Sequence, residues 1–524
     1  MRGQHYEDTQ MRLKSGLLSV PATGDKAFIP SPEKVFLFLG IVYGVLLLFI
    51  TPPFQIPDEP NHFYRAYQVA EGRLIAAKRH SPALNPDQMA ERDKEAREIQ
   101  ELLSQGDAEK ALEHYYDLKD AGGIGGLLPL SLATTTKAFH RLWLNKGNKQ
   151  NVKDIFLLLK LPLQRNNSIF IHFPNSAVYS PVPYLPQALG IATGKLFDLS
   201  PLLLMYLGRL VNLLSWVILV YFSIKITPLC KWLFFLLALM PMSIFQAASL
   251  SADSFTYGIS FLAISVFLRN AFEKNGGLPV TVITIFVVSL LLSLSKQAYF
   301  LIPLLFLLIP VEKIGTKSRF YALFFLLFLI NISAILLWTS IADIYQDIYE
   351  LYNALIPGLS AKKQTLFIIS HPLEYCSIVF STFVQNGRIY LDSFIGQLGW
   401  FDTGMSEYFR ISYVIMLFIA AFSGSRNSII ISLKQRSIMF STLLFSILLV
   451  STLAFIGWAP VGSKSLSIHG RYFIPLSPLF FLLFHNRKIS LDLHSIWPQM
   501  AFTCYSFFSL TYTVYVIIER YYIG

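Results

Sequence analysis

Two adjacent carboxylic acids, Asp58 and Glu59, follow an apolar run that ends at Ile50. They stand in a proline-rich stretch, PPFQIPDEPNHFYR, which covers residues 52–65. Proline fixes φ and has no N–H, so the chain leaves the apolar run along a stiff path. A carboxylate held at such a boundary could serve as a general base. The alternative is that Asp58 or Glu59 only caps the helix that begins near Pro60.

The residues that follow the pair predict a helix that would hold it in place. Phe63, Ala66, Tyr67 and Ala70 recur at intervals of three and four residues, which puts them on one helical face. Gly72 is a natural stop at the end of this helix. The pattern predicts an amphipathic helix that lies at the membrane surface, with the acidic pair at its start.

The composition is that of a membrane protein. Of the 524 residues, 54% are hydrophobic and only 14% are charged, unlike an average soluble domain. Many apolar runs reach the roughly 17–25 residues that span a bilayer. We therefore predict an all-α polytopic protein with about 11 transmembrane helices, in a range of about 10–13. The predicted spans are 35–51, 201–223, 232–250, 253–269, 279–295, 297–311, 320–341, 411–425, 437–458, 471–486 and 496–518.

Charge and cysteine content exclude two other classes of function. The net charge is +11, but no basic, aromatic-interleaved soluble domain is visible, so we predict no nucleic-acid partner. Cys230, Cys376 and Cys504 have no spacing typical of a metal site or a disulfide framework.

Lysine and arginine set the predicted orientation, because short cytoplasmic loops collect them. Their distribution predicts a cytoplasmic N-terminal tail, 1–34, a single transmembrane domain, 35–518, and a short outer tail, 519–524. Two large loops, 52–200 and 342–410, then lie on the outer face of the membrane.

The first large loop should carry amphipathic helices. A charged, helix-favouring run from Asp87 to Lys119 predicts a solvated helix pair. The segment from Tyr179 to Phe197 is apolar, but a crossing there would break the alternation of basic loops downstream. We therefore interpret it as a proline-broken interfacial or re-entrant helix.

Further polar residues map to the same outer face as Asp58. An ionisable group within a span costs about 2.5–3.5 kcal/mol on insertion scales, so each needs a reason. Two are acidic, Asp253 and Asp402, and three are basic, Lys296, His469 and Arg471. Charge pairing and snorkelling explain any one of them. Taken together, they predict an outer cavity with carboxylates beside phosphate-binding cations.

Such a cavity suits a lipid-linked sugar phosphate, which has an apolar tail and an anionic head. Lys296 and Arg471 would hold the phosphate, Arg471 as a bidentate fork. Asp58 would deprotonate the hydroxyl of the acceptor. Glu59 would position the acceptor, bind a cation or cap the helix, and these alternatives stay open.

Other residues are candidates for binding rather than for chemistry. Aromatic rings in the outer regions could stack on a sugar, although an aromatic belt at the membrane interface is the commoner reason for them. We assign to substrate binding His62, Arg65, Tyr184, Asp253, Lys296, Trp400, Asp402, Arg471 and Tyr472.

A divalent cation is an open alternative. Asp58, Glu59 and His62 lie within one helical turn, and Asp253 could complete a carboxylate-rich site for Mg²⁺ or Mn²⁺. The spacing is not diagnostic, so we predict no required cofactor.

Five blocks carry a resemblance to a known family. They are PDEPNHFYRAY at 57–67, YSPVPYLPQ at 179–187, SAD at 251–253, GWFD at 399–402 and GRYFIP at 470–475, with Lys296 between them. Over Val35 to Pro478 the chain resembles an uncharacterised family of predicted bacterial membrane proteins, domain of unknown function 2142, grouped with the GT-C glycosyltransferases. His469 stands where that pattern has glutamine.

The resemblance implies a GT-C-like helical bundle with a large first outer loop that carries an acidic motif. It implies a polyprenyl-phosphate sugar as donor and Asp58 as the base. Asp253 matches the second acidic position of that superfamily less closely.

These observations lead to one prediction and two alternatives. We predict an inverting glycosyltransferase of the bacterial inner membrane that transfers a sugar to a cell-envelope glycan or lipid at the periplasmic face. One alternative is a transporter or flippase for a lipid-linked glycan, but its ionisable residues should lie at mid-membrane and in repeated halves. The other is a glycan polymerase or ligase that uses a polyprenyl-diphosphate donor.

Overall fold

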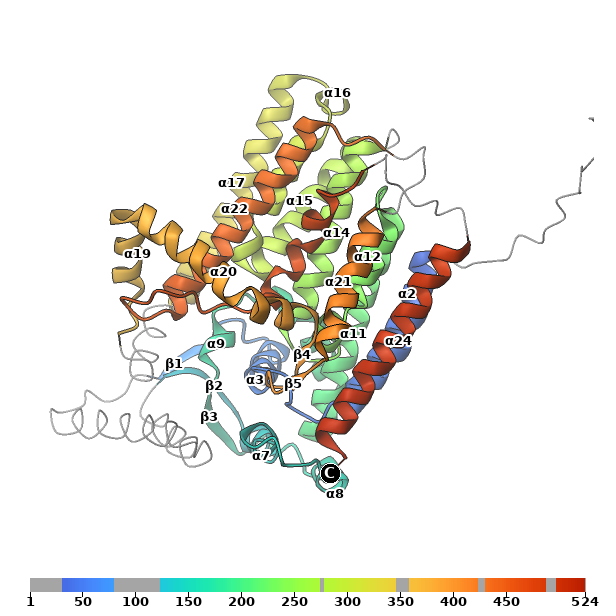
Figure 1. The fold of residues 1–524 in the computed structure, drawn as a ribbon. Coiled ribbons are helices and arrows are strands. Elements are labelled where there is room, and N and C mark those ends of the chain that lie inside the picture. The colour runs from blue at the N-terminus through green and yellow to red at the C-terminus, as the bar shows by residue number, and fades with distance from the viewer. Residues whose placement is uncertain are drawn as a thin grey trace, which may run out of the picture. The chain divides into compact units, whose positions relative to one another are not determined.

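Long apolar helices dominate the computed structural model (Figure 1). It describes residues 31–79, 123–273, 278–344, 358–422, 429–486 and 496–523. Six of the described helices are long and apolar enough to cross a membrane: α2 (Pro32–Ile50), α11 (Pro201–Ile226), α14 (Ala252–Phe272), α17 (Lys317–Ala342), α22 (Leu433–Trp458) and α24 (Ile496–Tyr521). The prediction of an all-α polytopic membrane protein is confirmed.

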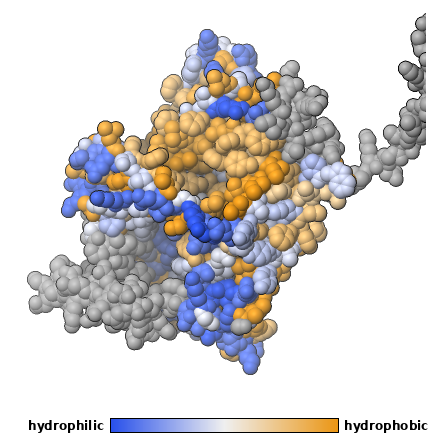
Figure 2. Space-filling model, in the orientation of Figure 1, coloured by the Kyte–Doolittle hydropathy of each residue, from blue (hydrophilic) through white to orange (hydrophobic). Residues whose placement is uncertain are grey.

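The outward faces of these helices are apolar, as a bilayer requires. On α17, large side chains such as Phe325, Leu329 and Leu336 are more than half exposed. In Figure 2, hydrophobic residues cover a broad central area, and hydrophilic residues gather above and below it. Such a surface would be unfavourable in water and is stable against lipid.

The remaining predicted spans are helical but short or broken. They correspond to α12 (Lys231–Ala238) with α13 (Pro241–Ala247), α15 (Leu278–Ser295), the 3₁₀ segments η2 (Gln297–Tyr299) and η3 (Ile302–Leu308), α21 (Glu407–Ala421), and η4 (Gly470–Leu476) with α23 (Ser477–Leu482). Pro241 begins α13 after the break that follows α12, and Pro303 and Pro475 lie within the 3₁₀ segments η3 and η4. Proline disfavours a regular α-helix at these positions because it lacks a hydrogen-bond donor. The count of about 11 crossings stays a prediction.

One membrane-length element lies within the predicted loop 342–410. Helices α19 (Ala361–Ser370) and α20 (Pro372–Ile395) meet at an angle of 106° and would add a seventh span if they count as one. The apolar pattern of α20 is interrupted by the polar residues Asn386, Arg388 and Asp392. For this reason the sequence did not predict a membrane-length helix there.

Helix α11 is central to the packing around the site. It contacts α2, α14 and the shorter α10 (Leu185–Leu196). Small residues permit the close approach, since a Cβ at Gly190 of α10 would overlap the backbone carbonyl of Leu207. The contact between α10 and α11 therefore brings the region between α2 and α11 against the long apolar helices.

The region between α2 and α11 contains a small sheet that the sequence did not predict. Strands β1 (Ala77–Arg79), β2 (Gly123–Pro129) and β3 (Ser168–His172) pair antiparallel in the order β1-β2-β3. Gly125 pairs with both Ala77 and His172, and a Cβ at Gly125 would overlap the carbonyl of Ile171. The glycine-rich sequence of β2 is typical of a break, yet here it permits close strand pairing.

Short helices complete this region: α6 (Leu130–Lys137), α7 (Arg141–Leu144), α8 (Val152–Leu159), α9 (Pro174–Ala177) and the 3₁₀ turn η1 (Val182–Tyr184). The predicted helix pair between Asp87 and Lys119 and most of the tail 1–34 lie outside the described residues. Helix α10 has 12 residues, about 18 Å, and is too short to cross the ~30 Å hydrocarbon core by itself.

The helix after the acidic pair forms as predicted but lies in a different environment. It is α3 (Glu59–Ala70), and Gly72 follows it with φ +75°. Ten of its twelve residues are buried, because α9, α10, η1 and β2 cover it. The prediction that this helix lies amphipathic on the membrane surface is wrong, since α3 is packed inside the protein.

Candidate functional site

A cavity of about 610 Å³ lies at the start of α3. Its walls come from α3, α9, α14, α20, η4 and the turn between β4 (Gln397–Leu398) and β5 (Thr403–Gly404). Seven of the eleven predicted site residues line it: Asp58, His62, Asp253, Lys296, Trp400, Arg471 and Tyr472. Side chains that are up to about 400 positions apart in sequence thus meet in one place.

Asp58 lines the cavity, and its side chain does not cap α3 although it stands at the N-cap position. Its backbone is left-handed, with φ 65° and ψ 4°, a conformation that aspartate tolerates better than most residues. Within the described residues its carboxylate makes no capping hydrogen bond. Instead, Oδ1 accepts a hydrogen bond of 2.7 Å from Nδ2 of Asn175.

The electrostatic surroundings of Asp58 suit a base. Burial raises the pKa of its carboxyl above the ordinary value, and the positive charge of Arg471 opposes this shift. The negative charge of Asp253 adds to it. A carboxylate with a raised pKa is a stronger proton acceptor than one in water.

Asp253, Lys296 and Arg471 form a charged cluster in the same cavity. Ser251 caps α14 and places Asp253 in its first turn, and Lys296 follows the end of α15. Lys296 forms an ion pair with Asp253, while Nε of Arg471 lies 4.0 Å from Oδ2 of Asp253. Two cations therefore share one carboxylate, and the cluster has a net positive charge.

Arg471 retains capacity to bind an anion. Its side chain is almost fully buried, but its Nε has no hydrogen-bond partner in the described part of the chain. The guanidinium stacks on Phe401 and Tyr472, with its carbon 5.3 Å and 5.5 Å from the ring centroids. A buried donor without a partner is costly, and an anionic ligand would satisfy it.

Two histidines on the lining are neutral at pH 7. Burial lowers the pKa of His62 to about 3 and that of His469 to about 4. Nδ1 of His62 lies 2.7 Å from the hydroxyl of Tyr184, and the ring of His469 stacks on Phe401 with centroids 4.4 Å apart. Both imidazoles can form hydrogen bonds with a substrate without adding charge to the cavity.

Glu59 occupies a different environment from its neighbour Asp58. Its carboxylate is fully buried in a bidentate pair with Arg209 of α11, at 2.6 Å and 2.8 Å, and also accepts from the N–H of Leu250. Arg209 in turn donates to the carbonyls of Leu48, Thr51 and Pro52. The described lining of the cavity does not include Glu59, so its place in the fold is that of a structural link.

Three other candidates also lie behind the lining. Arg65 is fully buried and donates to Gln68 and to the carbonyl of Leu74, and Tyr184 supports His62. Asp402 pairs with Arg520 at 2.7 Å near the end of α24. These residues hold the walls of the cavity and do not face its space within the described structure.

Sequence reasoning missed residues that complete the site. Asn175, Tyr390 and Phe401 line the cavity but carry no charge that would single them out. Arg209 was also missed, although an arginine within an apolar span is itself a signal of a buried partner. Tyr179 belongs to one of the sequence blocks, but no role was predicted for it.

The donor set does not fit a divalent cation. Among the described residues, no three His, Cys, Asp or Glu side chains converge as metal ligands. Of the four candidate ligands, Glu59 is bound by Arg209 and Asp253 by Lys296. Two of the three candidate carboxylates, Glu59 and Asp253, are therefore already paired with side-chain cations, and Asp58 is the third.

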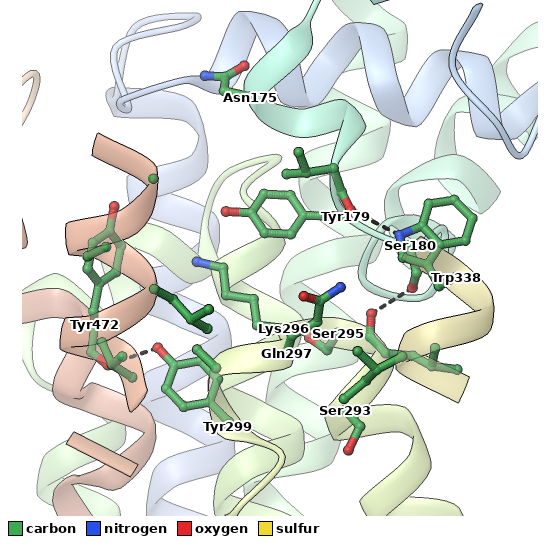
Figure 3. Close-up of a pocket in the computed structure, with 18 of the residues that line it drawn as sticks. Asn175, Tyr179, Ser180, Ser293, Ser295, Lys296, Gln297, Tyr299, Trp338 and Tyr472 are labelled. Carbon is green, nitrogen blue, oxygen red and sulfur yellow. Dashed lines mark hydrogen bonds between the residues drawn. The ribbon is translucent and has the colours of Figure 1, made fainter. Parts of the chain in front are cut away.

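A second cavity, of about 260 Å³, has the lining shown in Figure 3 and shares part of it with the first cavity. The two share five residues: Asn175, Tyr179, Lys296, Trp458 and Tyr472. The amine of Lys296 lies between two rings, 5.3 Å from the centroid of Tyr179 and 5.2 Å from that of Tyr472. Lys296 thus marks the junction of the two spaces.

The second cavity is largely apolar. Helix α17 contributes Ile335 and Trp338, and α22 contributes Val450, Leu453 and Ala454. Trp338 is fixed by a hydrogen bond of 3.0 Å from its indole N–H to the carbonyl of Val178. An apolar space between membrane-length helices that ends at a cation can hold a lipid tail and its anionic head.

Comparison with known proteins gives one match. A family model described as "Predicted membrane protein (DUF2142)" matches residues 41–480, which include every block from 57–67 to 470–475. Neither the curated proteins nor the solved structures contain a match.

Proposed function

Since the chain belongs to the DUF2142 family of predicted membrane proteins, we propose a reaction for its cavity. In this reaction the protein acts as an inverting glycosyltransferase, which moves a sugar from a polyprenyl-phosphate donor to a glycan or lipid of the cell envelope. The reaction takes place at the periplasmic face of the bacterial inner membrane. The resemblance to the GT-C glycosyltransferases supports this proposal, since an aspartate of the first outer loop is the base there.

One structural observation carries the proposal. Asp58 and the Lys296–Arg471 pair line the same cavity, and Lys296 also borders the apolar space between α17 and α22. A proton acceptor, an anion site and an apolar cavity are therefore contiguous. A polyprenyl-phosphate sugar needs all three, because its tail is apolar, its head is anionic and its reaction requires a base.

Residues of the cavity assist both the proton transfer and the departure of the phosphate. The hydroxyl oxygen of the acceptor attacks the anomeric carbon as Asp58 takes its proton. The bond from the anomeric carbon to the phosphate oxygen breaks, and its electron pair leaves with the polyprenyl phosphate. Lys296 and Arg471 stabilise the charge on that leaving group. A single displacement inverts the anomeric centre and needs one base.

The cavity walls would orient the sugar. Trp400 lines the space and donates its indole N–H to the carbonyl of Phe54 at 3.1 Å, so its ring position is fixed. Neutral His62 offers its second ring nitrogen as a hydrogen-bonding group. Fixed aromatic faces with a few polar groups are typical of sites that bind small polar ligands.

The test is transfer by an Asp58→Asn variant in lipid nanodiscs. Polyprenyl-phosphate sugars serve as donors, envelope glycolipids as acceptors, and mass spectrometry detects the released polyprenyl phosphate. We expect transfer to fall by about 10²–10⁴-fold, the usual contribution of a general base. The control is Asp343→Asn, which removes an exposed carboxylate from the end of α17. Near-normal transfer by Asp58→Asn would remove this residue from the mechanism.

The same variant should remain folded. The amide that replaces the carboxylate retains a carbonyl oxygen that can accept from Asn175. The substitution also removes a buried carboxylate whose raised pKa signals a cost of ionisation. Because that cost applies above the ordinary pKa of aspartate, Asp58→Asn should not lower the melting temperature at pH 7.

A further inference from the structure

Helix α8 (Val152–Leu159) has an unusual outer surface. Ile155, Leu158 and Leu159 pack against the hydrophobic core, which fixes the inner face of the helix. A surface helix of a soluble domain would then present polar residues outward. Instead, Phe156 and Leu157 are 62% and 68% exposed, and Val152 beside them is half exposed. This helix is apolar on two sides.

The residues around α8 are strongly basic. Positions 137–165 contain seven lysines and arginines and one acidic residue, which leaves a net charge of +6. Arg141 pairs with that acid, Asp154, at 2.5 Å. Lys153 and Lys160 lie one turn on either side of Leu157, are exposed, and have no carboxylate partner among the described residues.

The position of α8 is that of a membrane boundary. The N–H of Gln150 donates to the carbonyl of Tyr521 at 2.8 Å, and Lys149 donates to the carbonyls of Glu519 and Arg520. These are the last residues of α24, and α8 also packs on α11 (Figure 1). The helix is thus tied to the end of a membrane-length helix, where lipid headgroups would lie.

We propose that α8 binds anionic phospholipid headgroups at the bilayer surface, with Phe156 and Leu157 inserted among the acyl chains. Lys153 and Lys160 bind the lipid phosphates on either side. An exposed apolar stripe flanked by lysines is the pattern of an interfacial helix, and anionic lipids strengthen its attachment. The contact would set the depth of the first outer loop, including the cavity at Asp58. It does not depend on the reaction proposed above.

The test places a nitroxide label on a Leu157→Cys variant in which Cys376 and Cys504 are serine; Cys230 is buried and is retained. The protein is reconstituted in nanodiscs of phosphatidylcholine alone or with about one third phosphatidylglycerol, as needed to vary surface charge. Electron paramagnetic resonance compares collisions of the label with oxygen and with a water-soluble nickel complex. We expect oxygen collisions to dominate, and their excess to rise several-fold with phosphatidylglycerol.

Substitution of Lys153 and Lys160 separates the electrostatic attraction to anionic lipid from the insertion of the apolar side chains. In Lys153→Gln/Lys160→Gln the response to phosphatidylglycerol should disappear, while the label stays inserted in phosphatidylcholine. The matched control Lys362→Gln/Lys363→Gln removes two exposed lysines from α19 and should keep the full response. A label that is accessible to the nickel complex in both lipids, or a response that survives loss of Lys153 and Lys160, would overturn the proposal.

Discussion

Asn175 donates a hydrogen bond of 2.7 Å to the carboxylate of Asp58, across 117 positions of sequence. The donor sits on α9, a four-residue helix, and the acceptor stands at the left-handed residue before α3. Within the described residues, the bond holds one carboxylate oxygen and leaves the other free to take a proton. Two short segments of the region between α2 and α11 therefore orient the proposed base.

Loss of this bond should change the pH dependence of transfer. The hydrogen bond from Asn175 stabilises the ionised carboxylate and so lowers the pKa of Asp58, against the larger effect of burial. Asn175→Ala removes that stabilisation, so the pKa rises further and less base is ionised at a given pH. The acid limb of the kcat/KM profile should move to higher pH. A lower rate with an unmoved acid limb would assign Asn175 a merely structural role.

Arg471 should govern affinity for the donor. Its Nε, which has no hydrogen-bond partner in the described part of the chain, and its neighbour Lys296 form the proposed phosphate site. A hydrogen bond to a charged group contributes about 1.5–3 kcal/mol, so Arg471→Met should weaken donor binding by roughly 10–100-fold. Arg471→Lys should recover only part of this, since lysine lacks the planar fork. Titration with a polyprenyl-phosphate analogue measures the donor affinity of each variant. Unchanged affinity in Arg471→Met would contradict the role of Arg471 in binding the phosphate.

Glu59 should matter for stability and not for chemistry. Its pair with Arg209 is fully buried, and removal of one member of such a pair costs about 3–5 kcal/mol. Glu59→Gln should lower the melting temperature strongly, while the protein that remains folded keeps its transfer rate. Asp58→Asn should show the reverse pattern. A stable Glu59→Gln protein without activity would place Glu59 in the reaction.

The apolar cavity should discriminate donors by tail length. Ala454 of α22 faces this space, and Ala454→Trp would fill much of its 260 Å³. We expect a higher KM for donors with long polyprenyl chains and little change for a donor with a short chain. Leu444→Trp, on the same helix but outside the described cavity lining, is the control. Equal effects on short and long donors would show that the tail binds elsewhere.

The sequence predicted the helical membrane class and most of the cavity because both depend on local or strongly marked features. Apolar runs of membrane length identify spans, and charged residues near span ends are rare enough to attract attention. Four such charged residues line the cavity together in the structure: Asp58, Asp253, Lys296 and Arg471.

What the sequence did not predict depends on long-range packing. Glu59 is adjacent to Asp58, yet the turn at Asp58 directs the two carboxylates to different partners, and only the fold shows that Arg209 pairs with Glu59. Asp402 was chosen for its charge and is bound by Arg520 from the far end of the chain. Asn175 carries no charge and no periodicity that would have identified it. The sheet around Gly125 was missed because glycine in a strand resembles a break.

The proposed function requires that one cavity hold the phosphate of a polyprenyl-phosphate sugar beside Asp58. A cryo-electron microscopy map of the protein in nanodiscs with a non-transferable donor analogue tests it most directly. We predict phosphate density within hydrogen-bonding distance, about 3 Å, of Arg471 and Lys296, with the first isoprene units between α17 and α22. Phosphate density at another place, or a tail that leaves the cavity by a route away from Lys296, would contradict the account.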